Sequence, residues 1–397
     1  MIHGDLLRIA MFTDSYLPSR DGVVNSILIT KQKLEELGHE VIVFAPDPGK
    51  DEDREEGTQY FRSVAYRSYQ GYRVPMFPTN KCQILEELDV DVIHSQGLLL
   101  MALRSMFAGR SLRLPVVTSF HTMITEAVEY YTWLPLPKEV MDVLFWRYLR
   151  SLLQRSEVVI APTQAILDEL LCYAPNIRKG EVIPTGVDCR RFRPDVDGSA
   201  IRERYGLEGK VILHLGRIAW EKNLDLVLKS FKTLLEKDRT LRLMIVGSGP
   251  ARDHYMEVAK NMGIANEVIF PGFVADEELP MYYAACDVFA LASKFETQGL
   301  VVLEAMASGK VVACIDYRAT TEIVNEGVDG YLFDDSVESC SKTLEKALNS
   351  SDSIRENARR TAERYSINKM AERLVKVYEY AIEQKRERSG EPKRKIT

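Results

Sequence analysis

The sequence predicts an α/β protein made of two doubly wound domains, each a parallel sheet covered by helices. The chain has 397 residues, more than one ordinary hydrophobic core holds together. Short apolar runs alternate with longer amphipathic stretches, which is the pattern of parallel strands joined by helices. A breaker-rich segment at residues 183–188 separates two series of such runs.

The strands expected in the first series are short apolar runs, and they fall at residues 7–12, 41–45, 91–94, 116–120 and 158–161. In the second series the same pattern predicts strands at residues 211–215, 243–246, 268–270, 288–291 and 311–314. Among the helices, one at residues 26–37 is expected to end at Gly38, a typical C-cap residue. A last helix is expected at residues 370–384, and the charged residues 385–397 are expected to fray.

These elements predict two Rossmann-like domains that face each other across a cleft. The N-terminal domain is expected at residues 1–185 and the C-terminal domain at residues 186–367, with the closing segment, about residues 368–397, packing back on the first domain. Open parallel sheets bind ligands beyond the carboxyl ends of their strands. The residues that follow the strands are therefore where the chemistry is expected.

The composition argues against several other classes of protein. The formal net charge of -6 lacks the basic footprint of a nucleic-acid-binding protein. No run approaches the roughly 20 apolar residues of a membrane-spanning helix, and we expect no signal peptide. The six cysteines are scattered without a CxxC pair, which favours reduced thiols in the cytoplasm over disulfides or a zinc site.

Two glutamates flank an expected helix start in the most informative segment, residues 293–309. Glu296 lies in the loop before the helix, which begins near Gly299, and Glu304 lies about one turn inside it. Free backbone amides and the helix dipole suit a phosphate group, whereas carboxylates accept hydrogen bonds from sugar or ribose hydroxyls. The plain alternative is that Glu296 is a solvent-exposed loop residue and Glu304 an ordinary helix carboxylate.

This segment resembles the signature of glycosyltransferase family 4, in which seven residues separate the two glutamates. The resemblance implies the GT-B fold and a retaining enzyme that moves a hexose from a nucleotide-diphosphate sugar to an acceptor hydroxyl. It assigns Glu296 to the donor sugar and Glu304 to the ribose. The backbone amides of Gln298, Gly299 and Leu300 are expected to meet the sugar and the diphosphate.

The resemblance covers nearly the whole chain, because four further stretches match the family pattern: residues 13–23, 216–223, 246–250 and 271–274. It implies donor-binding roles for one residue of the first domain and four of the second, namely Gly22, Gly216, Gly247, Phe273 and Val274. A glycine lets the backbone approach a diphosphate closely. The last two of these residues are expected near the nucleobase.

Two cations follow the expected strand at residues 211–215. Arg217 and Lys222 match the family's diphosphate-binding stretch and are expected to stabilise the charge that develops on the leaving diphosphate, without a metal. The alternative is a solvated arginine and an ordinary lysine at a helix start. Asp89 and Asp91 have the Asp-x-Asp spacing of a metal-binding pair found in other glycosyltransferases. They precede their strand, however, and are interpreted as residues that lead into it. We expect no metal, and no cofactor besides the substrate nucleotide sugar.

His121 follows the expected strand at residues 116–120 and matches the family's histidine, so the resemblance places it in the donor-sugar pocket. A lone histidine is otherwise more often structural than catalytic. His94 also ends a strand and is a weaker candidate, and Asp14 is an alternative participant. The resemblance implies front-face substitution, in which the acceptor hydroxyl attacks from the side that the diphosphate leaves and a phosphate oxygen helps remove its proton.

The expected acceptor is a membrane lipid. Basic and aromatic residues of the first domain could form a surface that binds anionic membrane: Arg104, Arg110, Arg113, Trp133, Trp146, Arg147, Tyr148 and Arg150. An ordinary helix face with a buried apolar side is the alternative.

The chain resembles the glycolipid-forming branch of the family at residues 120–123, at Glu126, at Tyr130-Tyr131 and at Thr297. At the position of Thr297, many relatives have an aromatic residue. This implies a diacylglycerol-like or phospholipid acceptor and peripheral attachment to the inner face of the cell membrane. UDP-glucose is the expected donor, and GDP-mannose remains an alternative.

Three rival functions make different predictions. A sugar-nucleotide epimerase would consume the donor without any acceptor. An inactive nucleotide-sugar-binding module would release no nucleotide, although the complete set of charged residues argues against it. An NAD-dependent dehydrogenase is disfavoured, because Arg252 stands where the fingerprint that starts at Gly247 and Gly249 requires a third glycine.

Overall fold

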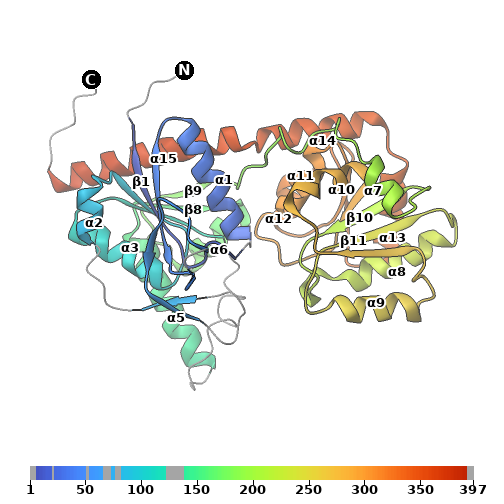
Figure 1. Ribbon diagram of the computed structural model, residues 1–397, viewed down its shortest axis with the longest axis horizontal. Coiled ribbons are helices and arrows are strands. Elements are labelled where there is room, and N and C mark those ends of the chain that lie inside the picture. Colours follow the sequence, from blue (N-terminus) through green and yellow to red (C-terminus); the bar gives the residue numbers. More distant parts are fainter. Residues whose placement is uncertain are drawn as a thin grey trace. The chain divides into compact units, whose positions relative to one another are not determined.

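The computed structural model describes residues 6–19, 22–50, 53–65, 73–76, 82–121 and 138–390. The chain divides into two compact units, one formed by Met1–Gly186 with Ile367–Thr397 and the other by Val187–Ser366. Each unit is built on a parallel sheet with helices packed against it (Figure 1). The two units are described separately.

In the first unit, the described residues form a seven-stranded parallel sheet in the order β3-β2-β1-β6-β7-β8-β9. Its strands are β1 (Arg8–Phe12), β2 (Glu40–Pro46), β3 (Gln59–Phe61), β6 (Val92–Ser95), β7 (Val116–Ser119), β8 (Val158–Ala161) and β9 (Gly180–Val182). The longer strands lie where apolar runs predicted them. The sequence did not predict β3, β9 or the antiparallel pair β4 (Ser63–Ala65) and β5 (Arg73–Pro75), because three residues are too few to show a period.

The helices of this unit are α1 (Gly22–Glu36), α2 (Cys82–Glu87), α3 (Leu100–Ser111), α5 (Lys138–Arg155), α6 (Gln164–Tyr173) and α15 (Ile367–Ser389). Helix α1 begins at Gly22, earlier than the expected start at residue 26, and Gly38 follows it at a φ of 92°. Helix α6 begins after Thr163, whose side chain accepts a hydrogen bond from the amide of Ile166.

The second unit contains a six-stranded parallel sheet in the order β12-β11-β10-β13-β14-β15. Its strands are β10 (Val211–Leu215), β11 (Arg242–Val246), β12 (Val268–Gly272), β13 (Val288–Leu291), β14 (Val311–Ile315) and β15 (Tyr331–Phe333). The strand order reverses between β10 and β13, and ligands of such sheets bind beyond the carboxyl ends at this switch point.

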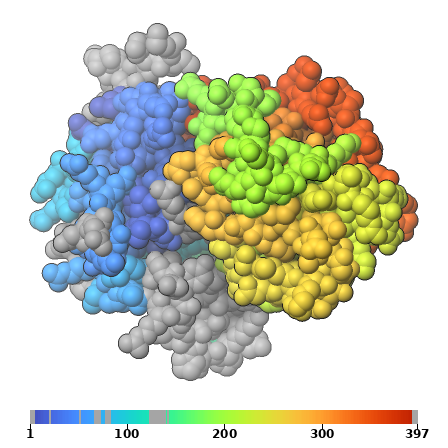
Figure 2. All heavy atoms as spheres, turned by 45° about the vertical axis from the view of Figure 1, so that its right-hand side comes forward, coloured from blue at the N-terminus to red at the C-terminus, as the bar shows by residue number. Residues whose placement is uncertain are grey.

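Helices cover both faces of this second sheet. They are α7 (Ser199–Arg204), α8 (Leu224–Leu235), α9 (Arg252–Asn261), α10 (Leu279–Ala285), α11 (Leu300–Ala307), α12 (Ala319–Ile323), α13 (Val337–Leu348) and α14 (Asp352–Arg364). Because successive strand residues point to opposite faces, Ile212 packs in a core with α8 and α13, whereas Leu213 packs in a second core with α11 and α14. Figure 2 shows the surface of the second unit from one side, coloured green to orange.

Helix α15 returns to the first unit and completes its core. Met370, Leu374 and Tyr378 are buried there with strand residues such as Met11. The expectation of a frayed end from residue 385 is wrong for residues 385–389, which are helical. Lys385 and Arg388 both pair there with the buried carboxylate of Glu157, and these ion pairs hold the last turns of the helix against the unit.

Within the described ranges, none of the helices combines the length and the apolar character that crossing a membrane requires. The amphipathic helices bury one side against a sheet and expose the other.

Candidate active site

A glycine starts the helix that follows β13. Gly299 is the N-cap of α11 and adopts φ 82° and ψ 52°, a left-handed conformation that residues with side chains rarely adopt. The helix then begins at Leu300, as predicted, and Gln298 is buried directly before it. The first backbone amides of α11 therefore lie at the carboxyl edge of the sheet, where a helix N-terminus suits an anion.

Lys222 and Glu296 contact each other at this edge. The ammonium Nζ of Lys222, which ends the 3-10 helix η2 (Trp220–Lys222), lies 2.7 Å from Glu296 Oε1. Both side chains are largely shielded, with 18% and 17% of their surface exposed. Two residues that the sequence assigned to the reaction, 74 positions apart, thus form one ion pair beside the start of α11.

Arg217 lies closer to solvent than this ion pair. Its side chain is 44% exposed, and its Nη2 lies 3.7 Å from Glu221 Oε1. An exposed ion pair of this length contributes little to stability, typically about 0–1 kcal/mol.

The loops that follow β10, β11 and β12 meet at the same edge through glycines. The Gly216 amide donates to Val246 O at 3.0 Å, and the Gly247 amide donates to Gly272 O at 2.9 Å. A Cβ added to Gly247 would lie 1.9 Å from Gly216 O, so the side chain of any other residue would force these two loops apart. Gly216 itself has open space around it, as backbone contact with a ligand requires.

Glu304 lies in the second turn of α11 and accepts a hydrogen bond from Tyr283 Oη, at 2.7 Å from Glu304 Oε2. Desolvation raises the pKa of its carboxyl group to about 7, although the tyrosine hydroxyl partly opposes this shift. Beyond β12, Phe273 is 78% exposed and Val274 is partly buried. An exposed aromatic ring next to a loop edge could stack on a flat ligand group.

In the first unit, His121 follows β7 and its Nε2 lies 2.6 Å from Gln96 Oε1. Gly22 is the first residue of α1, and no atom would meet a Cβ there within 4 Å. Both residues lie beyond carboxyl ends of strands in this sheet, as predicted. They belong to the first unit, whereas Lys222 and Glu296 belong to the second.

Comparisons with known proteins agree with this geometry. The family model described as Glycosyltransferase Family 4 matches residues 20–191, and the model described as Glycosyl transferases group 1 matches residues 199–365. The alpha-monoglucosyldiacylglycerol synthase of Streptococcus pneumoniae is 33% identical over 337 residues, which cover 82% of this chain and 75% of that protein. The chain belongs to glycosyltransferase family 4.

Other relatives and a solved structure extend the comparison. The GDP-mannose-dependent alpha-mannosyltransferase of Corynebacterium glutamicum is 28% identical over 342 residues, covering 83% of this chain and 77% of that protein. The structure of Anabaena Alr3699/HepE in complex with UDP matches with a TM-score of 0.74 at 19% identity, covering 94% of this chain and 100% of that chain. The family and the GT-B fold predicted from the sequence are confirmed.

Several residues that the sequence offered to the glycosyltransferase have structural roles instead. Asp14 does not line an open site, because its two carboxylate oxygens accept the amides of Leu99 and Met101 at 2.9 Å each and so cap α3. Burial raises the pKa of Asp14 to about 6. His94 is fully buried between neighbouring side chains.

The expected membrane surface is also partly wrong. Arg104 is buried, donates to Met76 O and lies 4.3 Å above the ring of Phe61. Tyr148 Oη donates to Leu99 O at 2.8 Å. The ring of Trp146 stacks on that of Tyr173, with their centroids 3.6 Å apart. The exposed members of the predicted set among the described residues are Arg110, Arg113, Arg147 and Arg150.

Part of the family pattern lies outside the described residues. This holds for Thr122, Met123, Glu126, Tyr130 and Tyr131, and for Arg20 and Asp21 of the N-terminal glycine loop. Trp133 of the expected membrane surface also lies outside the described residues.

Sequence reasoning missed two partners of the candidate residues. Gln96 contacts His121, and Tyr283 contacts Glu304. The spacing of His94 and Gln96 was a usable signal, because Gln96 directly follows β6 and a spacing of two favours the same side of an extended chain. For Tyr283 no local signal existed.

Among the residues described, no group of three or more histidine, cysteine, aspartate or glutamate side chains could hold a metal ion. Asp89 and Asp91 both bind Arg8. The Arg8 guanidinium lies 2.7 Å from Asp89 Oδ2, and the Arg8 amide donates to Asp91 Oδ2 at 2.9 Å. The two aspartates therefore stabilise the starts of the neighbouring strands β1 and β6.

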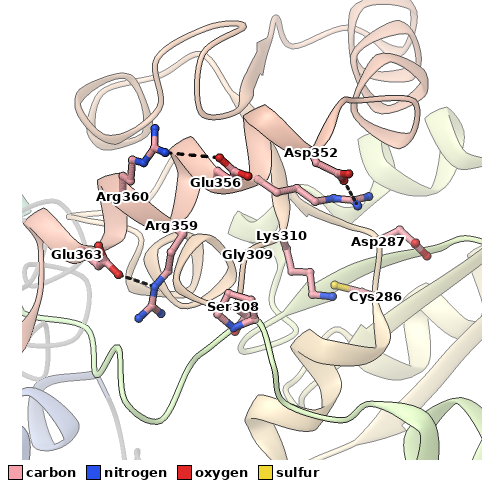
Figure 3. A pocket seen from close by; sticks show the side chains of 12 residues that line it. Cys286, Asp287, Ser308, Gly309, Lys310, Asp352, Glu356, Arg359, Arg360 and Glu363 are labelled. Atoms are coloured by element: carbon pink, nitrogen blue, oxygen red, sulfur yellow. Dashed lines mark hydrogen bonds and ion pairs between the residues drawn. The ribbon is translucent and has the colours of Figure 1, made fainter.

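A pocket of about 530 Å³ lies at the amino ends of the strands of the second sheet, the edge opposite to the candidate site (Figure 3). Its cations are already engaged. Arg359 donates to the carbonyl oxygens of Cys189, Phe192 and Ala307, and Lys310 donates to that of Ala284. These contacts join α14 to the rest of the unit, so the pocket wall is structural.

Proposed function

We propose that the protein is a retaining, metal-independent hexosyltransferase that uses UDP-glucose and glycosylates a hydroxyl of a diacylglycerol-like or phospholipid membrane lipid. One observation carries the proposal: the Lys222–Glu296 ion pair lies beside the start of α11, at the switch point of the sheet. A cation, a sugar-binding carboxylate and free helix amides are thereby gathered in one place.

The donor fits this arrangement group by group. Lys222 and Arg217 stabilise the negative charge that grows on the leaving diphosphate. The amides at the start of α11 bind the diphosphate, and Glu296 accepts hydrogen bonds from sugar hydroxyls. Glu304 accepts hydrogen bonds from the ribose. Phe273 and Val274 lie beside the nucleobase.

The proposed chemistry is front-face substitution. The acceptor oxygen forms its bond to the anomeric carbon on the side from which the diphosphate oxygen leaves, so the configuration is retained. The acceptor proton passes to an oxygen of the leaving phosphate, and no protein nucleophile takes part. His121 binds a hydroxyl of the donor sugar.

Two observations support a lipid acceptor. One relative bears the name alpha-monoglucosyldiacylglycerol synthase. Helix α5 also exposes an apolar strip, with Val140 44%, Val143 66% and Leu144 51% exposed. Their spacing places these residues on one side of the helix, and exposed arginines follow at positions 147 and 150. Apolar side chains next to cations suit an anionic membrane surface.

GDP-mannose is the alternative donor, since another relative is named a GDP-mannose-dependent alpha-mannosyltransferase. The two donors differ in the base and in the sugar. The contacts of the α11 backbone with the diphosphate would serve both donors, because both carry that group.

A donor screen tests the proposal. The purified protein is incubated with UDP-glucose, UDP-galactose or GDP-mannose, with and without diacylglycerol in anionic vesicles, and nucleotide release is measured. We expect release from UDP-glucose only when the lipid is present, with an α-linked product. Donor consumption without lipid would indicate an epimerase or a hydrolase. Donor binding without release under all conditions would indicate an inactive binding module.

A further inference from the structure

A chain of hydrogen bonds crosses the interior of the first unit and ends at His121. Tyr378 Oη of α15 lies 2.7 Å from His94 Nδ1, and Gln96 Nε2 lies 3.1 Å from the same nitrogen. His94 Nε2 lies 2.7 Å from Ser119 Oγ. Gln96 Oε1 then lies 2.6 Å from His121 Nε2. The sequence assigned no role to Gln96 or Tyr378.

The direction of these hydrogen bonds follows from the chemistry of each group. Burial lowers the pKa of His94 to about 3, so its ring is neutral and carries one proton. The Gln96 amide nitrogen can only donate, so His94 Nδ1 accepts from it and also from Tyr378 Oη. The single proton of His94 therefore lies on Nε2 and is donated to Ser119 Oγ.

The amide of Gln96 has its nitrogen towards His94 and its oxygen towards His121. Its NH₂ group is used by His94, so its oxygen faces His121. An amide oxygen can only accept, and His121 Nε2 must then carry a proton. The Gln96 backbone is fixed as well, because its amide donates to Phe12 O at 2.7 Å, and the residue is 4% exposed.

We propose that Gln96 is a positioning residue that orients the imidazole of His121 and keeps its proton on Nε2. The inference rests on the proposed role of His121 at the donor sugar. With the proton on Nε2, the lone pair of His121 is on Nδ1, which makes Nδ1 an acceptor, the kind of atom to which a sugar hydroxyl donates. The ring is then held in one tautomer before the donor binds.

The second part of the inference concerns the end of the chain. Tyr378 lies 284 positions after His94 and belongs to the helix that follows the second unit. Loss of its hydroxyl would leave His94 Nδ1 with Gln96 alone. The returning helix thus supports the residue that holds His121, and this gives α15 a role besides covering the core.

Nitrogen-15 NMR of histidine-labelled protein tests the tautomer directly, without any substrate. The chain has six histidines, so each signal can be assigned by single substitution. We expect the neutral ring of His121 to carry its proton on Nε2. A proton on Nδ1 would overturn the proposal, whether or not the protein transfers sugar.

Kinetics of Gln96→Met test the consequence. Methionine fills a similar volume but can neither accept from His121 nor donate to His94. We expect kcat to fall about 10- to 100-fold with little change in the KM for the donor, because the ring is misplaced rather than removed. The His121 tautomer signal should change with it. An unchanged kcat together with an unchanged tautomer would overturn the proposal.

Gln32→Met is the matched control, since Gln32 is exposed and its side-chain nitrogen donates to Glu36 Oε1 at 3.2 Å. It should leave kcat and all histidine signals unchanged. If Gln96→Met does not fold, the tautomer of His121 in the unaltered protein still decides. If the unaltered protein shows no transfer with any donor, the proposed function fails, while the NMR result on Gln96 stands by itself.

Discussion

Lys222 Nζ lies 2.7 Å from Glu296 Oε1, and each side chain is more than four-fifths shielded from solvent. An ion pair in this setting holds its two members in place and neutralises both charges while no ligand is bound. A donor that brings a diphosphate for the lysine and hydroxyls for the glutamate replaces one set of partners by another. In the proposed function, the pair therefore keeps the site organised between turnovers.

Substitution of either member should nearly abolish transfer. We expect Glu296→Gln and Lys222→Met each to lower kcat/KM by at least about 100-fold, because the first removes the carboxylate that binds the donor sugar and the second removes a cation that stabilises the developing charge. The double variant should be little worse than the single ones, since both members act on one bound donor. Initial rates with saturating lipid acceptor measure this.

Lys294→Met is the control for that experiment. Lys294 Nζ pairs with Asp335 Oδ2 at 2.6 Å in the same unit, with 40% of its side chain exposed. Loss of this exposed pair should change neither the rate nor the melting temperature by much. Near-normal transfer by Glu296→Gln would contradict the assignment of the site.

Glu304 should make donor affinity depend on pH. Its carboxyl group has a pKa of about 7, above the ordinary value of 4.5, and hydroxyl groups donate best to the ionised form. Affinity for UDP should therefore fall as the pH is lowered through about 7. Isothermal titration from pH 5.5 to 8.5 measures this change. In Glu304→Gln the profile should lose that component.

The same group should act on stability with the opposite sign. The folded protein binds this proton more tightly than the unfolded chain does, so the contribution to stability is complete below pH 4.5 and is lost as the pH rises through about 7. Asp14, with a pKa raised to about 6, contributes in the same direction. Thermal melts of Glu304→Gln should show a weaker loss of stability across this range. An unchanged pH dependence would rule out a strongly raised pKa for Glu304.

The fold could be predicted from the sequence because its signals are local. Buried parallel strands are short apolar runs, and the start of α11 is encoded by one glycine in a left-handed conformation. The sequence placed Lys222 and Glu296 each after a strand, and the structure brings them together because these strands, β10 and β13, are neighbours in the sheet. Local patterns thus give both the sheets and the edge at which the site forms.

Side-chain partners between distant segments could not be predicted. Arg104 was expected on a membrane surface, yet a backbone carbonyl and a phenyl ring from other segments bury it. Nothing near Tyr378 in the sequence indicates that its hydroxyl reaches His94. Such contacts depend on rotamers and on packing between elements, and composition and periodicity carry no information about either.

Glu157 should anchor the end of α15. Its side chain is 1% exposed and pairs with Arg178, Lys385 and Arg388. We expect Glu157→Gln to destabilise the first unit by about 1–3 kcal/mol, because cations lose a buried acceptor. Hydrogen exchange of α15 amides should accelerate with it. Glu345→Gln, which breaks the exposed pair with Lys237, should cost less than about 1 kcal/mol.

The exposed strip of α5 should mediate membrane binding. Burial of an aliphatic side chain contributes about 1.5–3 kcal/mol, so loss of two should weaken partitioning more than tenfold. We expect Val143→Ser with Leu144→Ser to reduce co-sedimentation with anionic vesicles while leaving UDP affinity unchanged. Val328→Ser removes a comparably exposed side chain, 52% exposed, from the second unit and should have no effect. Equal vesicle binding by both variants would place the membrane contact elsewhere, because α5 would then contribute no apolar surface to it.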